Sequence, residues 1–398
     1  MPDGGDAITI KIIDDIGRVA AAEWDACAAP AGAPVNPFVG HTFLHALERT
    51  GCTNAETGWL PQHLVIEDAA GSLVAAAPLY LKSHSYGEYV FDHGWADAFE
   101  RAGGRYYPKL QCAVPFTPVT GPRLLVRPGP RAEEYRAALV TGLIEMARRA
   151  GVSSVHVTFP TEEDARRLEA GGFLLRNGYQ FHWENAGYKS FDDFLGALAS
   201  RKRKAIRKER QQVAATGIAL AALTGDAIKG KHWDAFHRFY VSTYDRKWGY
   251  PYLTREFFEE LGASMADRVV LIMAERNGKP VAGALNLMGS DTLYGRNWGC
   301  AADVPFLHFE ACYYQAIDFA IAHGLQRVEA GTQGPHKLQR GYLPRLTWSA
   351  HWIRDAGFRR AIADFLARER RAIERDMVGF ASHSPYRQSD ETDGGAGH

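Results

Sequence analysis

Hydrophobic and polar positions repeat along the chain. The segment 64–80, LVIEDAAGSLVAAAPLY, aligns without gaps with the segment 271–287, LIMAERNGKPVAGALNL. In both segments a short apolar run reaches an acidic residue, a turn contains Gly71 or Gly278, and a Val-Ala-x-Ala run follows. Two β-rich runs joined by a glycine-containing loop are typical of a hairpin. The pattern therefore predicts two equivalent hairpins, one in each half of the chain.

A helix and then a strand are predicted after each hairpin. In the segments 135–159 and 310–332, apolar residues recur at helical spacing before a short β-rich run. Gly151 and Gly324 stand where a helix is expected to end, because glycine adopts the left-handed conformation of a C-terminal cap most easily.

An additional helix is expected before each hairpin, at 40–51 (GHTFLHALERTG) and 257–265 (FFEELGASM). The order of hairpin, helix and strand resembles the GNAT acyltransferase fold. We therefore expect an α/β (α+β) protein of two tandem GNAT-like domains, 1–185 and 186–387, each a mixed, mostly antiparallel sheet flanked by helices. The small, polar tail 388–398 is expected to be disordered.

The most basic stretch, LASRKRKAIRKER (198–210), lies where the two predicted domains join. An apolar stripe on one predicted helix is formed by Leu195, Leu198, Ile206 and Val213. Basic residues flank that stripe, and a solvated face is the ordinary interpretation of such flanks. Because the helix joins the two domains, we also expect its start to hold phosphate groups of a nucleotide-linked substrate or a tRNA end, through Lys202, Arg203 and Arg207.

Two GNAT-like units joined through a Lys/Arg-rich helix that ends at Gly217 resemble the Fem-type peptidyltransferases. The resemblance is closer to the shorter Fem-like N-acyltransferases, often labelled peptidoglycan biosynthesis proteins. It covers residues 36–387 and is supported by the blocks 106–125, 243–258 and 329–344. It implies direct transfer of an acyl or aminoacyl group to an amine acceptor in the groove between the units.

The segment EAGTQGPHKLQRGY (329–342) is the strongest candidate for the transfer centre. Its glycines prevent a regular helix and allow a close approach to a ligand. By resemblance to the Fem family, Lys337 would stabilise charge at the centre and Arg340 would hold a phosphate or carboxylate. The other candidates in this segment are Glu329, with a catalytic role, and His336 and Tyr342, with binding roles. The alternative is a solvated turn with surface charges.

Aminolysis of an ester or thioester also needs a group that accepts the proton of the amine. The segment YVFDHGWADAF (89–99) places Asp92 and His93 beside a glycine and between aromatic residues, where burial would tune their pKa values. The alternative is that Asp92 caps the helix that follows.

Two further segments are candidates for substrate binding. PFTPVTGPRLL (115–125) is predicted to be rigid and extended, so it could line a groove together with Arg123. DRKWGYPY (245–252) combines cations with rings that could stack on a base or a sugar, through Arg246, Lys247 and Trp248. The alternative for the second segment is a set of core aromatic residues.

Composition limits the partners. Lys and Arg number 46, as do Asp and Glu, and this balance argues against a DNA-binding protein. No apolar stretch approaches the length of about 20 residues that a membrane span requires. The acidic, glycine-containing N-terminus does not resemble a signal peptide, and the five cysteines include no C-x-x-C pair. We therefore expect a cytoplasmic protein without a metal.

The sequence does not identify the acyl donor or the amine acceptor. No permanently bound cofactor is expected, and the co-substrate is an activated acyl donor, either aminoacyl-tRNA or acyl-CoA. The acceptor is a small-molecule or peptide amine, with a nucleotide-linked molecule among the candidates. GCAADVPFLHFEACYY (299–314) lacks the glycine pattern with which GNAT enzymes hold coenzyme A, and no long heptad run is present. An acyl-CoA-dependent enzyme and a non-catalytic tRNA- or nucleotide-binding module are the alternatives.

Overall fold

The first half of the chain alternates short strands with helices. The computed structural model describes residues 8–245, 250–301, 303–331 and 334–387. The strands of the first half are β1 (Ile10–Ile13), β2 (Trp59–Pro61), β3 (His63–Glu67), β4 (Leu73–Ala77), β5 (Leu79–Lys82), β6 (Lys109–Cys112), β7 (Leu125–Val126), β8 (Ser154–Thr158) and β9 (Leu174–Glu184). Its helices are α1 (Ala21–Ala28), α2 (His41–Arg49), α3 (His93–Arg101), α4 (Ala132–Ala150) and α5 (Glu162–Ala170).

The second half repeats this alternation with longer strands. Its helices are α6 (Phe191–Ala197), α7 (Ser200–Ala214), α8 (Gly230–Asp245), α9 (Arg255–Ser264), α10 (Leu307–Phe309), α11 (Gln315–Ala322) and α12 (Ala356–Ser382). Its strands are β10 (Ile218–Thr224), β11 (Val269–Arg276), β12 (Lys279–Met288), β13 (Thr292–Cys300), β14 (Arg327–Glu329) and β15 (Leu343–Ile353). Short helical turns are η1 (Ile16–Arg18), η2 (Gly225–Ala227), η3 (Glu310–Tyr314) and η4 (Pro335–Arg340).

The two predicted hairpins are confirmed. β3 and β4 form the first, and β11 and β12 the second. Gly71 and Gly278 lie in the connecting turns with φ of 81° and 71°, a left-handed conformation that glycine adopts without a steric penalty. α4 ends at Gly151, which is also left-handed, as is Gly324 after α11. Each half is thus a GNAT-like unit, as the repeat predicted.

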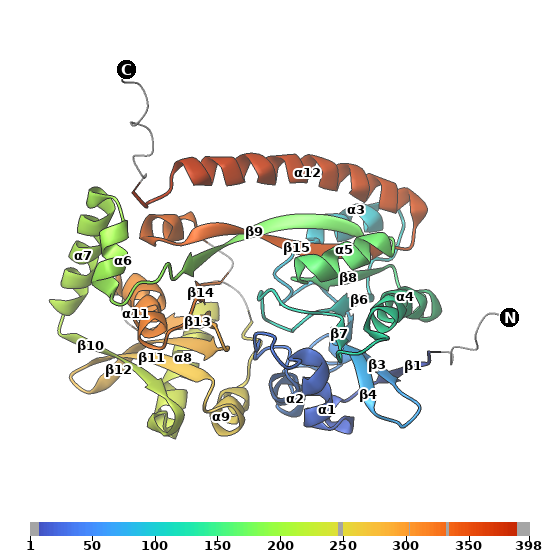
Figure 1. Ribbon diagram of the computed structural model, residues 1–398, viewed down its shortest axis with the longest axis horizontal. Helices are drawn as coiled ribbons and strands as arrows, with labels where there is room; N and C mark the ends of the chain where they lie inside the picture. Colours follow the sequence, from blue (N-terminus) through green and yellow to red (C-terminus); the bar gives the residue numbers. More distant parts are fainter. Residues whose placement is uncertain (1–7, 246–249, 302, 332–333, 388–398) are drawn as a thin grey trace, which may run out of the picture.

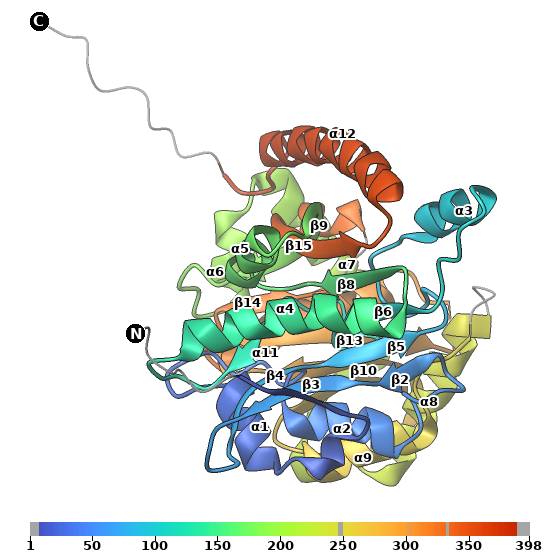
Figure 2. The ribbon, with the colours of Figure 1, turned by 90° about the vertical axis from the view of Figure 1, so that its right-hand side faces the viewer.

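The strands form two sheets (Figure 1). β1-β3-β4-β7 make a four-stranded sheet, and α4 covers β3 and β4 (Figure 2). The larger sheet has the order β10-β11-β12-β13-β14-β9-β15-β8-β6-β5-β2. It contains a parallel pair in each unit, β6 with β8 and β13 with β14, while its other pairs are antiparallel.

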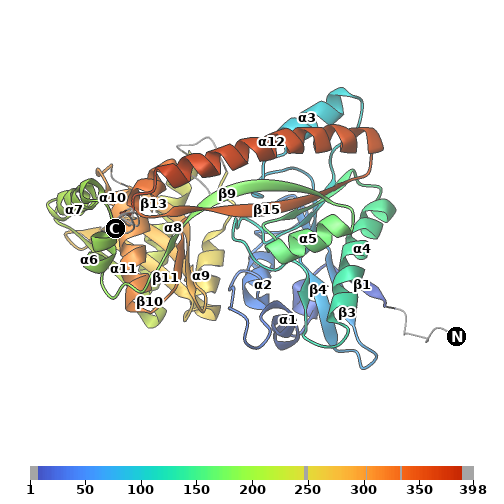
Figure 3. The same ribbon diagram turned by 45° about the horizontal axis from the view of Figure 1, so that its top comes forward.

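The two units exchange their last strands. β9 follows α5 in the first unit but pairs with β14 of the second, and β15 of the second unit pairs with β8 of the first. β9 and β15 also pair with each other over most of their length and form an arch between the units, along which α12 lies (Figure 3). The sheet therefore runs through the predicted domain boundary at residue 185, which stays a prediction.

A shared hydrophobic core joins the units below the arch. Phe43 of α2 and Phe257 of α9 pack edge to face with ring centroids 5.8 Å apart, and both are buried in the same cluster. The equivalent helices of the two units therefore pack against each other, which fixes the space between the units.

The basic helix is shorter than the apolar stripe predicted. The chain leaves the helical conformation at Leu198 and Ala199, so α6 and α7 are separate helices. The break lets Leu198 form a β-bridge with Tyr386, while the N–H of Ala199 donates to Pro385 O at 2.9 Å. Ile206 and Val213 of α7 are buried, as expected. The tail 388–398 lies outside the described residues. No helix in the described ranges combines the length and apolar character of a membrane span.

We expect the fragment 1–185 not to fold, because β8 loses β15 and the core loses Ala350 and Trp352, which pack with Val155 and Leu143. Circular dichroism should show no cooperative melt. In the matched control, a short hairpin turn joins residue 184 to residue 343, since Leu343 pairs with His182 across the arch. This joined chain, ending at 387, should melt cooperatively. A cooperative melt of the fragment 1–185 alone would contradict the importance of the exchange.

Candidate functional site between the two units

A groove of about 850 Å³ lies between the two units beside the arch. The extended segment Thr120–Gly121–Pro122 lines it from the first unit, as the prolines of this segment predicted. The second unit contributes Asp291, Tyr294, Arg327 and Glu329, and the arch contributes His182 and Arg345. The groove is therefore lined by both units and carries charged side chains of both signs.

Strand pairing brings three of these side chains together. Glu329 ends β14, where it is the register partner of Tyr294 in β13 and of His182 in β9. Register partners on neighbouring strands project to the same face of a sheet, so the three side chains meet at the groove. The exchange of β9 between the units is what places His182 beside Glu329.

Glu329 is buried, with 5% of its surface exposed, and its Oε2 has no hydrogen-bond partner among the described residues. Burial raises the pKa of Glu329 to about 7, against the lowering effect of Arg327. His182 Nδ1 lies 3.8 Å from Glu329 Oε1, but burial lowers the pKa of His182 to about 3, so this imidazole is neutral at pH 7. A carboxylate with a pKa close to the working pH can accept and release a proton.

Lys337 occupies the short helix η4, which follows β14. It is buried, and its Nζ donates to Gly331 O at 2.8 Å, two residues after Glu329. Burial lowers the pKa of Lys337 to about 8. Gly334 has a φ of 112°, and a Cβ there would collide with the ring of His336. This glycine is therefore required for the turn that buries the lysine.

Arg340 is bound inside the protein. Its Nη2 and Nε donate to Glu209 of α7 at 2.7 and 3.2 Å, its Nη1 donates to His336 O at 2.8 Å, and its guanidinium lies 3.5 Å from the ring centroid of Phe309. These bonds use donors that a phosphate or carboxylate would need. Arg340 thus joins η4 to α7.

Lys202 also links α7 to η4, since its Nζ donates to Gln339 Oε1. His336 Nε2 lies 2.9 Å from the hydroxyl of Tyr313, and the hydroxyl of buried Tyr342 donates to the carbonyl of Tyr313 at 3.3 Å. The predicted residues of the segment 335–342 therefore form one packed unit around η4, with α7 on one side.

The family model described as peptidoglycan biosynthesis/recognition matches residues 15–388, nearly the whole chain. The chain belongs to the FemAB-like family. This membership, together with the tandem GNAT-like units, makes it a Fem-like acyltransferase, as the sequence predicted. A search of the curated proteins finds no significant match.

Solved structures with similar folds are distant in sequence. FemX shares 12% identity at a TM-score of 0.53, with 87% of this chain and 98% of that chain covered. The C-terminal domain of a putative lysylphosphatidylglycerol synthetase from Agrobacterium fabrum shares 11% at 0.53, covering 86% and 96%. L-PGS from Bacillus licheniformis shares 11% at 0.50, covering 90% and 99%. At these identities the likeness concerns the fold.

Asp92 lies apart from the groove of this FemAB-like protein. It precedes α3 but does not cap it with its side chain; instead its Oδ2 accepts from Lys109 Nζ at 2.6 Å and from the Tyr106 hydroxyl at 2.7 Å. Burial favours the neutral acid, yet Lys109 and His156 outweigh it and hold the pKa of Asp92 well below its usual range. His93, the next residue, is exposed. The two residues are not brought together with Glu329 or Lys337.

The remaining candidates are dispersed. Arg123 is buried and donates to the carbonyls of Thr158, Pro122 and Val119 at 3.0, 3.2 and 2.8 Å, so it holds its own segment in place and does not line the groove. Arg207 forms an exposed ion pair with Asp192, and Arg203 has no ion-pair partner in the described ranges. Three candidates, Arg246, Lys247 and Trp248, lie outside the described residues.

One half-buried cation near the groove was missed from the sequence. Arg296 is the extra residue of a bulge in the pairing of β13 with β12. Its Nη2 donates to Phe116 O of the first unit, and its charge lowers the pKa of Glu329. The available signal was an arginine beside Gly295 in a strand with several apolar and aromatic residues. No group of three or more His, Cys, Asp or Glu in the described part of the chain is placed to hold a metal ion.

Glu329→Gln should stabilise the protein at alkaline pH. A carboxyl whose pKa is raised in the folded state contributes stability below its unfolded pKa, near 4.5, and that contribution is lost as the pH rises through about 7. The variant should therefore match the wild type near pH 4.5 and exceed it at pH 8 by on the order of 3 kcal/mol. Urea unfolding at the two pH values measures this.

The matched control is Glu163→Gln, an exposed acid at the same groove. Its ion pair is a surface pair, so the free energy of unfolding should change by less than about 1 kcal/mol. If the free energy of unfolding of Glu329→Gln at pH 8 does not exceed that of the wild type, Glu329 has an ordinary pKa.

Proposed function

We propose that this FemAB-like protein joins an activated acyl or aminoacyl group to an amine in the groove between its units, with Glu329 as the general base. The observation that carries the proposal is the state of this carboxylate: it is buried at the groove, its Oε2 has no hydrogen-bond partner among the described residues, and its pKa is raised to about 7. A general base of this kind contributes roughly 10²–10⁴ to the rate.

In the proposed reaction the neutral amine nitrogen attacks the carbonyl carbon of an ester or thioester. The new C–N bond forms, the C–O or C–S bond of the donor breaks, and Glu329 removes the proton that the nitrogen loses. Glu329 then gives this proton to the leaving oxygen or sulfur, which returns the carboxylate to its starting state. We assign the required donor for the oxyanion to Lys337, since its Nζ binds Gly331 O, two residues after Glu329 in the chain, and the family resemblance implies the same role.

An acceptor with a carboxylate or phosphate fits the groove. Arg327 lines it and forms no ion pair or side-chain hydrogen bond among the described residues. Arginine binds carboxylate and phosphate oxygens in bidentate geometry. A peptide or nucleotide-linked amine would supply such a group, in agreement with the family description of peptidoglycan biosynthesis/recognition.

An aminoacyl donor is supported by two observations. Arg201, Lys204 and Lys208 form an exposed flank of α7, and α7 is tied to η4, where Lys337 lies. A polyanion bound along this flank would have its acyl end directed toward η4. Two proteins with similar folds are named as lysylphosphatidylglycerol synthetase and L-PGS. We therefore propose aminoacyl-tRNA rather than acyl-CoA as the donor.

Activity should depend on Glu329 in a pH-sensitive way. For transfer from aminoacyl-tRNA to an amine acceptor, kcat/KM should fall below about pH 7, because protonated Glu329 cannot accept a proton. Glu329→Gln should lower the rate by roughly 10²-fold or more and abolish this limb of the profile. Lys337→Met should lower kcat to a similar extent. If Glu329→Gln and Glu163→Gln have equal rates, Glu329 is not the general base.

Changing Arg201, Lys204 and Lys208 together to Ala should weaken tRNA binding and reduce the slope of log K against log salt, since fewer phosphates are neutralised. Filter binding at several salt concentrations measures both quantities. The matched control changes Arg101, Arg149 and Arg360, which are exposed cations elsewhere. If both triple variants give the same slope of log K against log salt, tRNA does not bind along this flank of α7. If acyl-CoA but not tRNA stabilises the folded protein, the thioester donor is favoured.

A further inference from the structure

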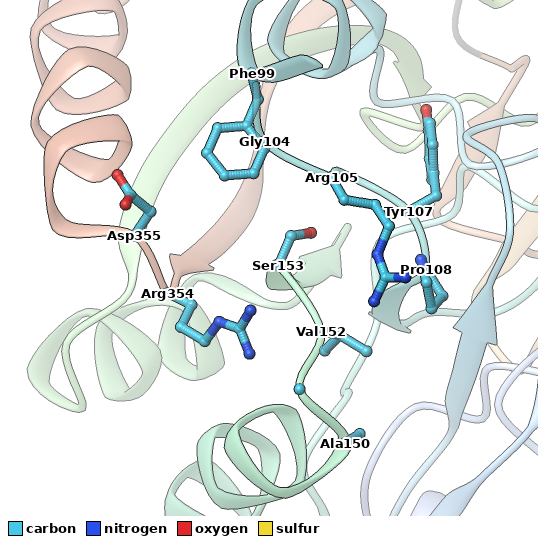
Figure 4. Close-up of a pocket in the computed structure, with 11 residues that line it drawn as sticks. Phe99, Gly104, Arg105, Tyr107, Pro108, Ala150, Val152, Ser153, Arg354 and Asp355 are labelled. Carbon is cyan, nitrogen blue, oxygen red and sulfur yellow. The ribbon is translucent and has the colours of Figure 1, made fainter. Parts of the chain in front are cut away.

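A second cavity, of about 410 Å³, lies in the first unit away from the groove (Figure 4). It is bounded by the end of α4, the segments leading into β6 and β8, and the turn between β15 and α12. β6 and β8 run parallel, and the groove is reached at their other end, through Thr161 after β8. The cavity and the groove therefore lie at opposite ends of these strands.

Two arginines from distant parts of the chain face this cavity. Arg105 precedes β6 and Arg354 follows β15, and Figure 4 shows both guanidinium groups directed into the space between them. Neither has an ion-pair partner in the described part of the chain, whereas Arg176, for comparison, is bound by Glu369 at 2.7 Å. Two like charges that converge without a counter-ion repel each other, and an anion between them would remove this repulsion.

The acid at the rim does not neutralise them. Asp355 lines the cavity, but its Oδ1 accepts the N–H of Phe358 at 2.6 Å and so caps the start of α12. In Figure 4 its carboxylate points away from the guanidinium groups. The cavity therefore carries a net positive charge.

The walls of the cavity are partly apolar. The ring of Phe99 stacks on Phe358 with centroids 4.5 Å apart, and Gly104 permits this ring to pack closely, since a Cβ there would meet it at 2.5 Å. Pro108 forms another apolar part of the lining. Ser153 is 92% buried and its hydroxyl contacts Ser154 Oγ at 3.1 Å. An aromatic wall and converging cations are the features with which proteins hold small organic anions.

We propose that this cavity binds a small organic oxyanion, a carboxylate or a phosphate monoester with a flat apolar body. Arg105 and Arg354 would hold the oxyanion through their paired N–H groups, and the body would lie against Phe99 and Pro108. The volume is within the range of small-molecule sites. No residue of the groove takes part, so the site is independent of the function proposed above.

Isothermal titration calorimetry tests this with phenyl phosphate and benzoate at constant ionic strength. The wild type should bind at least one of them, and whichever binds more tightly identifies the preferred oxyanion. Arg105→Ala and Arg354→Ala should each weaken that binding at least tenfold. Arg149→Ala is the matched control, because Arg149 is exposed at the end of α4 and does not line the cavity; its affinity should equal that of the wild type.

The exposed positions of Arg105 and Arg354 should leave folding intact, and melting temperatures within a few degrees of the wild type verify this. Absence of binding by the wild type at millimolar concentration would overturn the proposal. Equal weakening by Arg149→Ala would overturn it as well, and so would equally tight binding of the neutral probe benzyl alcohol.

Discussion

The pairing of β9 with β14, and of β15 with β8, is the constraint on which the rest of the structure depends. Backbone hydrogen bonds of a sheet cannot be left unmade in a buried interior without a large cost, so each unit needs the last strand of the other. The exchange makes one continuous sheet from two GNAT-like units and leaves β9 and β15 as an arch between them. The groove beside this arch is lined by residues of both units and of the arch itself.

The same pairing explains the electrostatics of the groove. The pairing of β9 with β14 places neutral His182 beside Glu329. Burial of Glu329 disfavours its ionised form and so raises its pKa. A buried carboxylate without a full set of partners destabilises the fold at neutral pH, and natural proteins keep such groups where their chemistry is needed. The cost of burying the ionised form and the proposed role as general base therefore both belong to Glu329.

Much of the architecture could be predicted from the sequence because it is encoded locally. Short-range signals mark the hairpin turns at Gly71 and Gly278 and the helix cap at Gly151. The repeat places equivalent signals in both halves of the chain. The candidate segment around Lys337 was found through its glycines and through resemblance to a known family.

The remaining features depend on contacts between distant residues. Sequence spacing cannot indicate that Arg340 forms an ion pair with Glu209, or that Asp92 forms one with Lys109. At the break, Leu198 forms a bridge with Tyr386, near the other end of the chain. The exchange of β9 and β15 has no local signal either, since a strand carries no mark of the unit with which it pairs.

The role of Glu329 as a general base is tested most directly by its pKa, measured by NMR titration of the protein carrying ¹³C-labelled glutamate carboxyls. Comparison with Glu329→Gln assigns the signal, and an amine acceptor analogue in the groove should shift it. We expect a carboxyl that titrates near pH 7 and is absent from the variant. If every glutamate, including Glu329, titrates below about pH 5, the ordinary range for this side chain, Glu329 is not the general base of the groove.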